Sequence, residues 1–229
     1  MTTIAANLQA VHERIARAAQ AAGRPAFDIT LLAVGKTFPA EEIAAACAAG
    51  QRAFGENYVQ EAVTKITQLS DLPITWHFIG PIQSNKTRVI AEHFAWVHGI
   101  EREKIAVRLN EARPANLPPL NVCIQINVSG EGSKSGIMPG EELALARAIT
   151  ALPRLRLRGL MAIPEPTPDA GLQRRRFALL RGIKDKLVAA GIPLDTLSMG
   201  MSDDLEAAIA EGATMVRVGT AIFGQRKKT

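Results

Sequence analysis

Lys36 is the residue of this sequence whose position best suits covalent chemistry. It follows the apolar run 29–34 and a single glycine, Gly35. A lysine that is partly desolvated at the end of a buried strand can lose its proton near neutral pH and form an imine with an aldehyde or a ketone. A lysine that ends the strand and points to water is the ordinary alternative, and this short motif is compatible with both.

Two glycine-containing turns near the end of the sequence suit a phosphate group. Residues 198–200 (SMG) follow one short apolar run, and Gly219-Thr220 follow the next. Small residues let backbone N–H groups approach an anion closely. Asp203 and Asp204 open the helix that follows the first turn, where they would repel a phosphate, so we place the anion on the two turns. Two ordinary strand-to-helix turns are the alternative.

Arg217 lies between these two turns and adds a fixed positive charge. A guanidinium does not give up its proton in a protein, so it can donate a hydrogen bond to a pyridine nitrogen and keep that nitrogen unprotonated. Taken without its neighbours, Arg217 would be better explained as a surface or ion-paired arginine.

Eight short apolar runs, each separated from the next by a helical pattern, would position these residues. We expect strands at 29–34, 52–54, 76–79, 96–98, 120–128, 155–163, 194–198 and 215–218, and helices at 3–22, 41–49, 58–69, 84–94, 102–112, 141–152, 169–190 and 203–211. Helices between successive strands require parallel pairing. The pattern predicts a single (β/α)8 barrel domain of the TIM type over residues 1–229. An open doubly wound sheet is the rival, but no G-x-G-x-x-G follows the first strand.

A closed barrel would bring the candidate residues together. Its last strand pairs with its first, so Lys36, Arg217 and the two turns would share one pocket at the carboxyl ends of the strands, where barrels carry their sites. An imine-forming lysine beside a phosphate cradle indicates a phosphorylated aldehyde. Pyridoxal 5′-phosphate and a phosphosugar both fit this description, and Arg217 favours the former because only pyridoxal phosphate has a ring nitrogen.

Composition excludes several classes of protein. The formal net charge is +5, but the basic clusters are short and aromatic residues make up only 4% of the chain, which argues against a nucleic-acid partner. No apolar run approaches the ~18 residues of a membrane span. No signal peptide is recognisable, so we expect a cytoplasmic protein. Cys47, Cys123 and the four histidines lack metal-ligand spacing, and no metal is expected.

Five motifs spread along the chain resemble the pyridoxal phosphate homeostasis proteins (the YggS/PROSC family). They are residues 54–61 (FGENYVQE), 77–86 (HFIGPIQSNK), 133–137 (SKSGI), 197–202 (LSMGMS) and 217–224 (RVGTAIFG). That family is similar to the barrel domain of alanine racemase but has no second β domain. The resemblance implies the alanine-racemase type of barrel, the fold of type III pyridoxal phosphate proteins.

The resemblance also implies a role for each site residue. Lys36 matches the lysine that holds pyridoxal 5′-phosphate covalently as an internal aldimine, and Arg217 matches the arginine that faces the pyridine nitrogen. The phosphate-binding segments match Ser198, Met199, Gly200, Gly219 and Thr220. Asn57 and Met161 correspond to positions that line the cofactor ring. His77 and Lys86 belong to the family signature, with packing of the strand-to-helix turn as an equal alternative.

The same pocket could serve a carrier or a catalyst. Racemases of this fold use two bases, a lysine of the barrel and a tyrosine that comes from the second domain. The family resembled here has no second domain, and Tyr58, the sole tyrosine of this sequence, already belongs to a family motif. An arginine at the ring nitrogen leaves the ring a weak electron sink, which disfavours decarboxylation. We therefore expect a monomer without catalytic residues that acts in vitamin B6 homeostasis and delivers pyridoxal phosphate to apoenzymes. A racemase-like enzyme and a phosphosugar aldolase are the alternatives.

Two further basic features suggest secondary roles. Lys134 could relay the cofactor outward through a second imine, and the tail Arg226-Lys227-Lys228 could hold a phosphate. A solvated loop lysine and a frayed terminus are the ordinary alternatives for these two features.

Overall fold

In the computed structural model, which describes residues 3–132 and 135–225, eight parallel strands pair in chain order and close into a barrel. The strands are β1 (Thr30–Val34), β2 (Ala53–Glu56), β3 (Thr75–Phe78), β4 (Trp96–Ile100), β5 (Leu120–Gln125), β6 (Leu155–Met161), β7 (Thr196–Ser198) and β8 (Met215–Val218). β8 pairs with β1, with Arg217 beside Leu32, and this pairing closes the ring. The predicted (β/α)8 barrel is confirmed.

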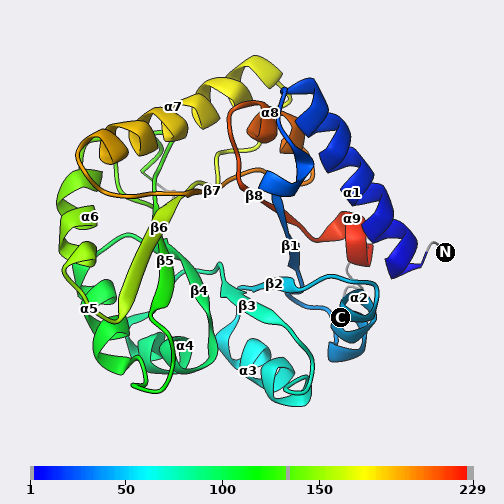
Figure 1. The fold of residues 1–229 in the computed structure, drawn as a ribbon, viewed down its shortest axis with the longest axis horizontal. Helices are drawn as coiled ribbons and strands as arrows, with labels where there is room; N and C mark the ends of the chain where they lie inside the picture. Colours follow the sequence, from blue (N-terminus) through cyan, green and yellow to red (C-terminus); the bar gives the residue numbers. More distant parts are fainter. Residues whose placement is uncertain (1–2, 133–134, 226–229) are drawn as a thin grey trace.

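Helices connect the strands and surround the barrel (Figure 1). They are α1 (Ile4–Ala21), α2 (Ala40–Ala48), α3 (Val59–Gln68), α4 (Thr87–His93), α5 (Glu103–Ala112), α6 (Glu142–Thr150), α7 (Ala170–Ala189), α8 (Leu205–Ala210) and α9 (Thr220–Phe223), with 3-10 turns η1 (Ala26–Asp28) and η2 (Ser84–Lys86). The helix expected at 84–94 is divided between η2 and α4, and the one expected at 203–211 is shorter. η1 and α9 were not expected, because each is a single turn and too short for a periodic pattern.

Local signals in the sequence explain where the two longest helices begin. The hydroxyl of Thr3 accepts a hydrogen bond from the N–H of Ala6 at the start of α1, and the carboxylate of Asp169 accepts one from Leu172 at the start of α7. Both side chains satisfy N–H groups that lack a partner within the helix.

The strands bury side chains on both faces. Leu31 and Ala33 belong to the apolar cluster between the strands and the helices, so the intervening Leu32 faces the barrel interior. The interior contains polar side chains as well, including buried His77, His98, Ser198 and Arg217. A barrel interior that holds this many polar groups requires an internal hydrogen-bond network.

The first and last helices lie next to each other. α1 packs against α8 and α9 (Figure 1), and the side-chain amide of Asn7 donates a hydrogen bond of 2.8 Å to the carbonyl of Ile222 in α9. The start and the end of the barrel are therefore held together outside the sheet as well as within it.

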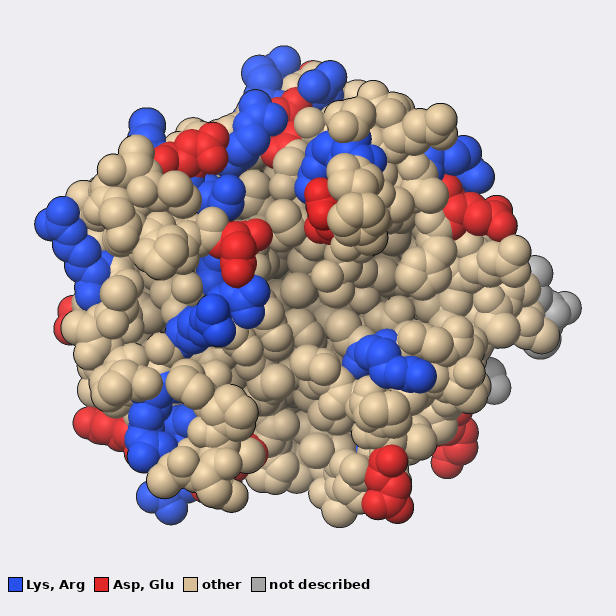
Figure 2. All heavy atoms as spheres, in the orientation of Figure 1, with Lys and Arg blue, Asp and Glu red and all other residues tan. Residues whose placement is uncertain are grey.

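The molecular surface carries charges of both signs. Figure 2 shows Lys and Arg interspersed with Asp and Glu around the face in view, while uncharged atoms fill its hollowed centre. Within the described part of the chain, no helix has the length and apolar character needed to cross a membrane.

Candidate functional site

A cavity of about 240 Å³ lies at the carboxyl ends of the strands and includes five of the predicted site residues. These are Lys36, Asn57, Arg217, Gly219 and Thr220. The cavity is somewhat smaller than the usual range for ligand sites, which is about 300–1,000 Å³. The pairing of β1 with β8 brings these residues together, because Lys36 follows β1 while Arg217 and Gly219 belong to β8 and its end.

Close backbone approach on the β8 side depends on a glycine. A Cβ atom at Gly219 would lie 3.1 Å from the carbonyl oxygen of Val34. The absence of a side chain at this position therefore keeps the end of β8 tight against the segment that leads into Lys36. Lys36, Asn57 and Gly219 are half-buried and Thr220 is exposed, so the cavity is open to solvent on one side.

Arg217 is buried and fixed from the barrel interior. Its guanidinium donates to the carbonyl oxygen of Ser198 at 2.6 Å and to the hydroxyl of Ser198 at 2.8 Å, and also to the carbonyl of Ala162 at 2.8 Å. Burial lowers the pKa of Arg217 to about 10, which leaves the group charged at neutral pH. The network orients the cation without neutralising it.

Two buried histidines extend this network away from Arg217. The hydroxyl of Ser198 lies 2.8 Å from Nδ1 of His98, and Nε2 of His98 lies 3.0 Å from Nδ1 of His77. Burial lowers the pKa of His77 to about 3 and that of His98 well below its usual value, so both rings are neutral at pH 7. Each contact is satisfied if Ser198 donates to His98 and His98 donates to His77.

Four predicted site residues lie behind the cavity and do not line it. The N–H of Met199 donates to the carbonyl of Met215, so it is not available to an anion, and the carbonyl of Gly200 accepts from the N–H of Arg217. Ser198 points into the barrel toward His98 and Arg217. Met161 is buried at the end of β6, beside Ser198 of β7. Together they form a supporting layer beneath Arg217.

Met201 and Ser202 line the cavity and were missed by the sequence interpretation. The two aspartates that follow Ser202 predict that an anion avoids this segment, yet Asp203 itself lines the cavity. The hydroxyl of Ser202 was the available signal, because it continues the small-residue run of 198–200. This turn thus lines the cavity with residues 201–203, not with the expected residues 198–200.

Asn57 presents a buried oxygen that lacks a partner in the described structure. Its Oδ1 atom is buried and makes no hydrogen bond there. A buried acceptor without a donor is costly, and this one belongs to a residue that lines the cavity. A donor group on a bound ligand would satisfy it.

Other sequence-level candidates lie elsewhere. His77 belongs to the buried network, and Lys86 lies in η2, away from the cavity lining. Lys134 and the tail Arg226-Lys227-Lys228 lie outside the described residues. Within residues 3–132 and 135–225, no group of three or more His, Cys, Asp or Glu is arranged to hold a metal ion.

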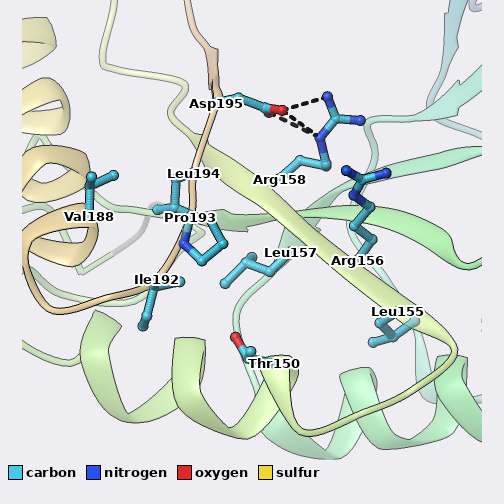
Figure 3. Close-up of a pocket in the computed structure, with 10 residues that line it drawn as sticks. All are labelled: Thr150, Leu155, Arg156, Leu157, Arg158, Val188, Ile192, Pro193, Leu194 and Asp195. Carbon is cyan, nitrogen blue, oxygen red and sulfur yellow. Dashed lines mark hydrogen bonds and ion pairs between the residues drawn. The ribbon is translucent and has the colours of Figure 1, made fainter.

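A larger cavity, of about 520 Å³, lies at the opposite end of the barrel (Figure 3). It is formed by the start of β6 and the segment before β7, and Figure 3 shows Arg158 paired with Asp195 at its edge. The other lining side chains are mainly aliphatic. Without a nucleophile or a phosphate-binding turn, it offers none of the chemistry that surrounds Lys36.

Comparisons with known proteins agree on one family. The family model described as "Alanine racemase, N-terminal domain" matches residues 6–227. The chain is 63% identical to the pyridoxal phosphate homeostasis protein of Pseudomonas aeruginosa, over 99% of this chain and 97% of that protein. It is 57% identical to the protein of the same name from Escherichia coli K12, over 99% and 98%. Among solved structures, PipY of Synechococcus elongatus with PLP bound is 38% identical, with a TM-score of 0.85 over 97% of this chain and 100% of that one.

Proposed function

Because this chain belongs to the family of pyridoxal phosphate homeostasis proteins and carries the alanine racemase N-terminal domain, we propose that it binds pyridoxal 5′-phosphate through Lys36 and holds it for delivery to apoenzymes, without catalysing a reaction itself. The observation that carries this proposal is the meeting of Lys36 with Arg217, Gly219 and Thr220 in one cavity where β8 closes against β1.

The residues present fit the chemistry of this cofactor. When bound, pyridoxal phosphate supplies an aldehyde that condenses with a primary amine and releases water. Lys36 is the amine in the cavity, and Arg217 is a fixed donor for the ring nitrogen. The unpartnered Oδ1 atom of Asn57 can accept a hydrogen bond from the ligand. These three groups account for the covalent bond and for the polar edge of the ring.

The phosphate would be held near the ends of β7 and β8. Thr220 and Ser202 provide hydroxyl groups, and Gly219 lets the backbone approach closely. We assign Ser198, Met199, Gly200 and Met161 to the supporting layer, because Ser198 and Gly200 hold Arg217 in place. This assignment keeps all nine predicted residues in the site and gives four of them an indirect role.

The lining of the cavity favours a carrier over a racemase. A racemase needs a base on each face of the substrate, and Lys36 can serve one face. Tyr58 is 57% exposed and does not line the cavity. Among the described lining residues the one carboxylate is Asp203, and it is exposed to solvent. The half-buried, accessible position of Lys36 suits transfer of the ligand to another protein.

Absorbance spectroscopy tests the proposal. Purified protein that has been mixed with pyridoxal phosphate and then separated from the unbound cofactor should show a visible band, because the ring becomes conjugated with the lysine nitrogen, whereas a bound phosphosugar gives no visible band. Lys36→Ala should lose the band, and Lys104→Ala, which removes an exposed lysine from α5, should keep it. Absence of a band in the wild type would contradict cofactor binding. Turnover of an amino acid that disappears in Lys36→Ala would contradict the carrier role.

A further inference from the structure

A buried ion-pair cluster lies directly beneath the segment that carries Lys36. Lys65 of α3 is 4% exposed, and Glu56 at the end of β2 is fully buried. The ammonium of Lys65 donates to Glu56 Oε1 at 2.9 Å, to Glu61 Oε1 at 2.5 Å and to the carbonyl oxygen of Gly35 at 2.8 Å. All three protons of this lysine are used, so its position is fully determined.

The cluster fixes the backbone on both sides of Lys36. Lys65 binds the carbonyl of Gly35, and Glu61 accepts the N–H of Thr37 at 2.6 Å. Thr37 has a φ of +68°, a left-handed conformation that a threonine adopts only when its surroundings impose it. The two anchors therefore hold a strained turn in which Lys36 is the central residue.

Gly35 is required for the same contact. A Cβ atom at this position would lie 2.8 Å from Glu56 Oε1 and 2.5 Å from Cδ1 of Ile43. A side chain at position 35 would push the turn away from the carboxylate. The glycine thus lets the Lys36 segment lie against the cluster.

Glu56 also interacts electrostatically with the charge of Lys36. Its second oxygen, Oε2, is buried and makes no hydrogen bond in the described part of the chain. Burial raises the pKa of Glu56 to about 7, with Lys65 acting against this effect, Glu61 adding to it and the charge of Lys36 opposing it. Among the described residues, the charged groups that act on Glu56 are Lys65 and Glu61 from α3 and Lys36 from the segment between β1 and α2. The interaction is reciprocal, because a carboxylate that is stabilised by an ammonium stabilises that ammonium equally.

We propose that Glu56, Lys65 and Glu61 are positioning residues that hold Lys36 at the cavity and couple the proton of its amine to the charge of Glu56. The inference deepens the proposed function, on which it rests for the role of Lys36. A neutral amine on Lys36 is the form that reacts with an aldehyde, so the cluster would set both the place and the protonation state of the reacting nitrogen.

Trace labelling with acetic anhydride measures this coupling without the cofactor. The full chain is first dialysed against hydroxylamine to release any bound aldehyde. It is then labelled across a pH series, and acetylation of Lys36 is read by mass spectrometry. Glu56→Gln should move the midpoint of Lys36 labelling to lower pH by about half a unit, which raises labelling below the midpoint about threefold. Glu61→Gln, at a half-exposed position, should give a smaller shift in the same direction.

Hydrogen exchange at the N–H of Thr37 measures the positioning separately. Glu61→Ala removes the acceptor and should speed this exchange at least tenfold, whereas Glu61→Gln retains an oxygen at the same place and should restore protection. Arg113→Met is the matched control, because it removes another buried cation, one that binds the carbonyls of Ala91, Phe94 and Pro118 around α4 and α5. It should leave both Lys36 readouts unchanged.

Two results would overturn the inference. One is a Lys36 labelling midpoint that is the same in folded Glu56→Gln, Glu61→Gln and wild-type protein. The other is a shift in Arg113→Met as large as that in Glu56→Gln, which would indicate a general effect of lost stability. If the visible band is missing but these shifts occur, the proposed function fails while the cluster stands. If the band is present and no shift occurs, the proposed function stands and the role of the cluster fails.

Discussion

At the scale of single residues, the main feature of the site is a charged arginine held by neutral partners. Arg217 donates to Ser198 and Ala162, and no carboxylate contacts its guanidinium in the described structure. Its positive charge is therefore available to a ligand, while its direction is fixed by the barrel. Ser198 matters most in this arrangement, because its hydroxyl joins the guanidinium to His98.

Removing that hydroxyl should be costly. Ser198→Ala leaves a buried nitrogen of His98 without a partner and removes one acceptor from Arg217, so we expect the free energy of unfolding to fall by about 2 kcal/mol. Urea unfolding monitored by circular dichroism measures the change. Ser70→Ala, the same substitution at an exposed position after α3, should stay within about 0.5 kcal/mol of the wild type. Equal stability of the two variants would show that the network contributes little.

At the scale of elements, the sequence predicted the barrel well and the site less completely. The eight apolar runs located every strand, because parallel strands buried on both faces are apolar along their length. Lys36 and Arg217 were placed correctly in one cavity because strand order alone brings β8 to β1. Periodicity does not determine where a turn ends or which way a side chain points. It therefore could not predict that Ser202 lines the cavity, or that His77 and His98 form a network in the barrel interior.

Strand packing at β6 and β7 gives a test at the same scale. A Cβ atom at Gly159 would lie 1.8 Å from the carbonyl oxygen of Thr196, whereas one at Gly182 in α7 would meet nothing within 4 Å. Gly159→Ala should therefore lower the free energy of unfolding by about 3 kcal/mol or more through strain between two strands. Gly182→Ala should raise it by about 0.5–1 kcal/mol because alanine favours the helix. Thermal unfolding of the pair provides the comparison, and a stable Gly159→Ala variant would mean that β6 and β7 can separate freely.

At the scale of the whole molecule, the buried histidines link stability to pH. Their pKa values are lowered in the folded state, to about 3 for His77. Below pH 6.5 the unfolded chain takes up protons that the folded chain does not. The contribution of the two neutral histidines to the free energy of unfolding is therefore complete above that pH and is lost as the pH falls toward 3. Glu56 acts in the opposite direction between pH 7 and 4.5, because its raised pKa means that the folded chain takes up the proton first.

A histidine variant isolates the contribution of His77. Between pH 7 and pH 5, its share of the loss in free energy of unfolding should be about 2 kcal/mol. His77→Gln should therefore lose less stability than the wild type over this interval, whereas His12→Gln, at an exposed position on α1, should follow the wild type. Urea titrations at both pH values give the loss in free energy of unfolding for each protein. An equal loss in wild type and His77→Gln would rule out this histidine as a source of the acid sensitivity.

The closure of β8 on β1 has a consequence for the protein during its synthesis. Two sides of the cavity are formed by the segments after β1 and at the end of β8, which pair in the barrel although most of the sequence separates them. A ribosome releases β1 long before β8, so the nascent chain carries Lys36 without Arg217, Gly219 or Thr220 beside it. Only a chain that has been translated through β8 can complete the cavity. A chain truncated before β8 should therefore bind the ligand poorly, because Arg217, Gly219 and Thr220 would be missing from the cavity.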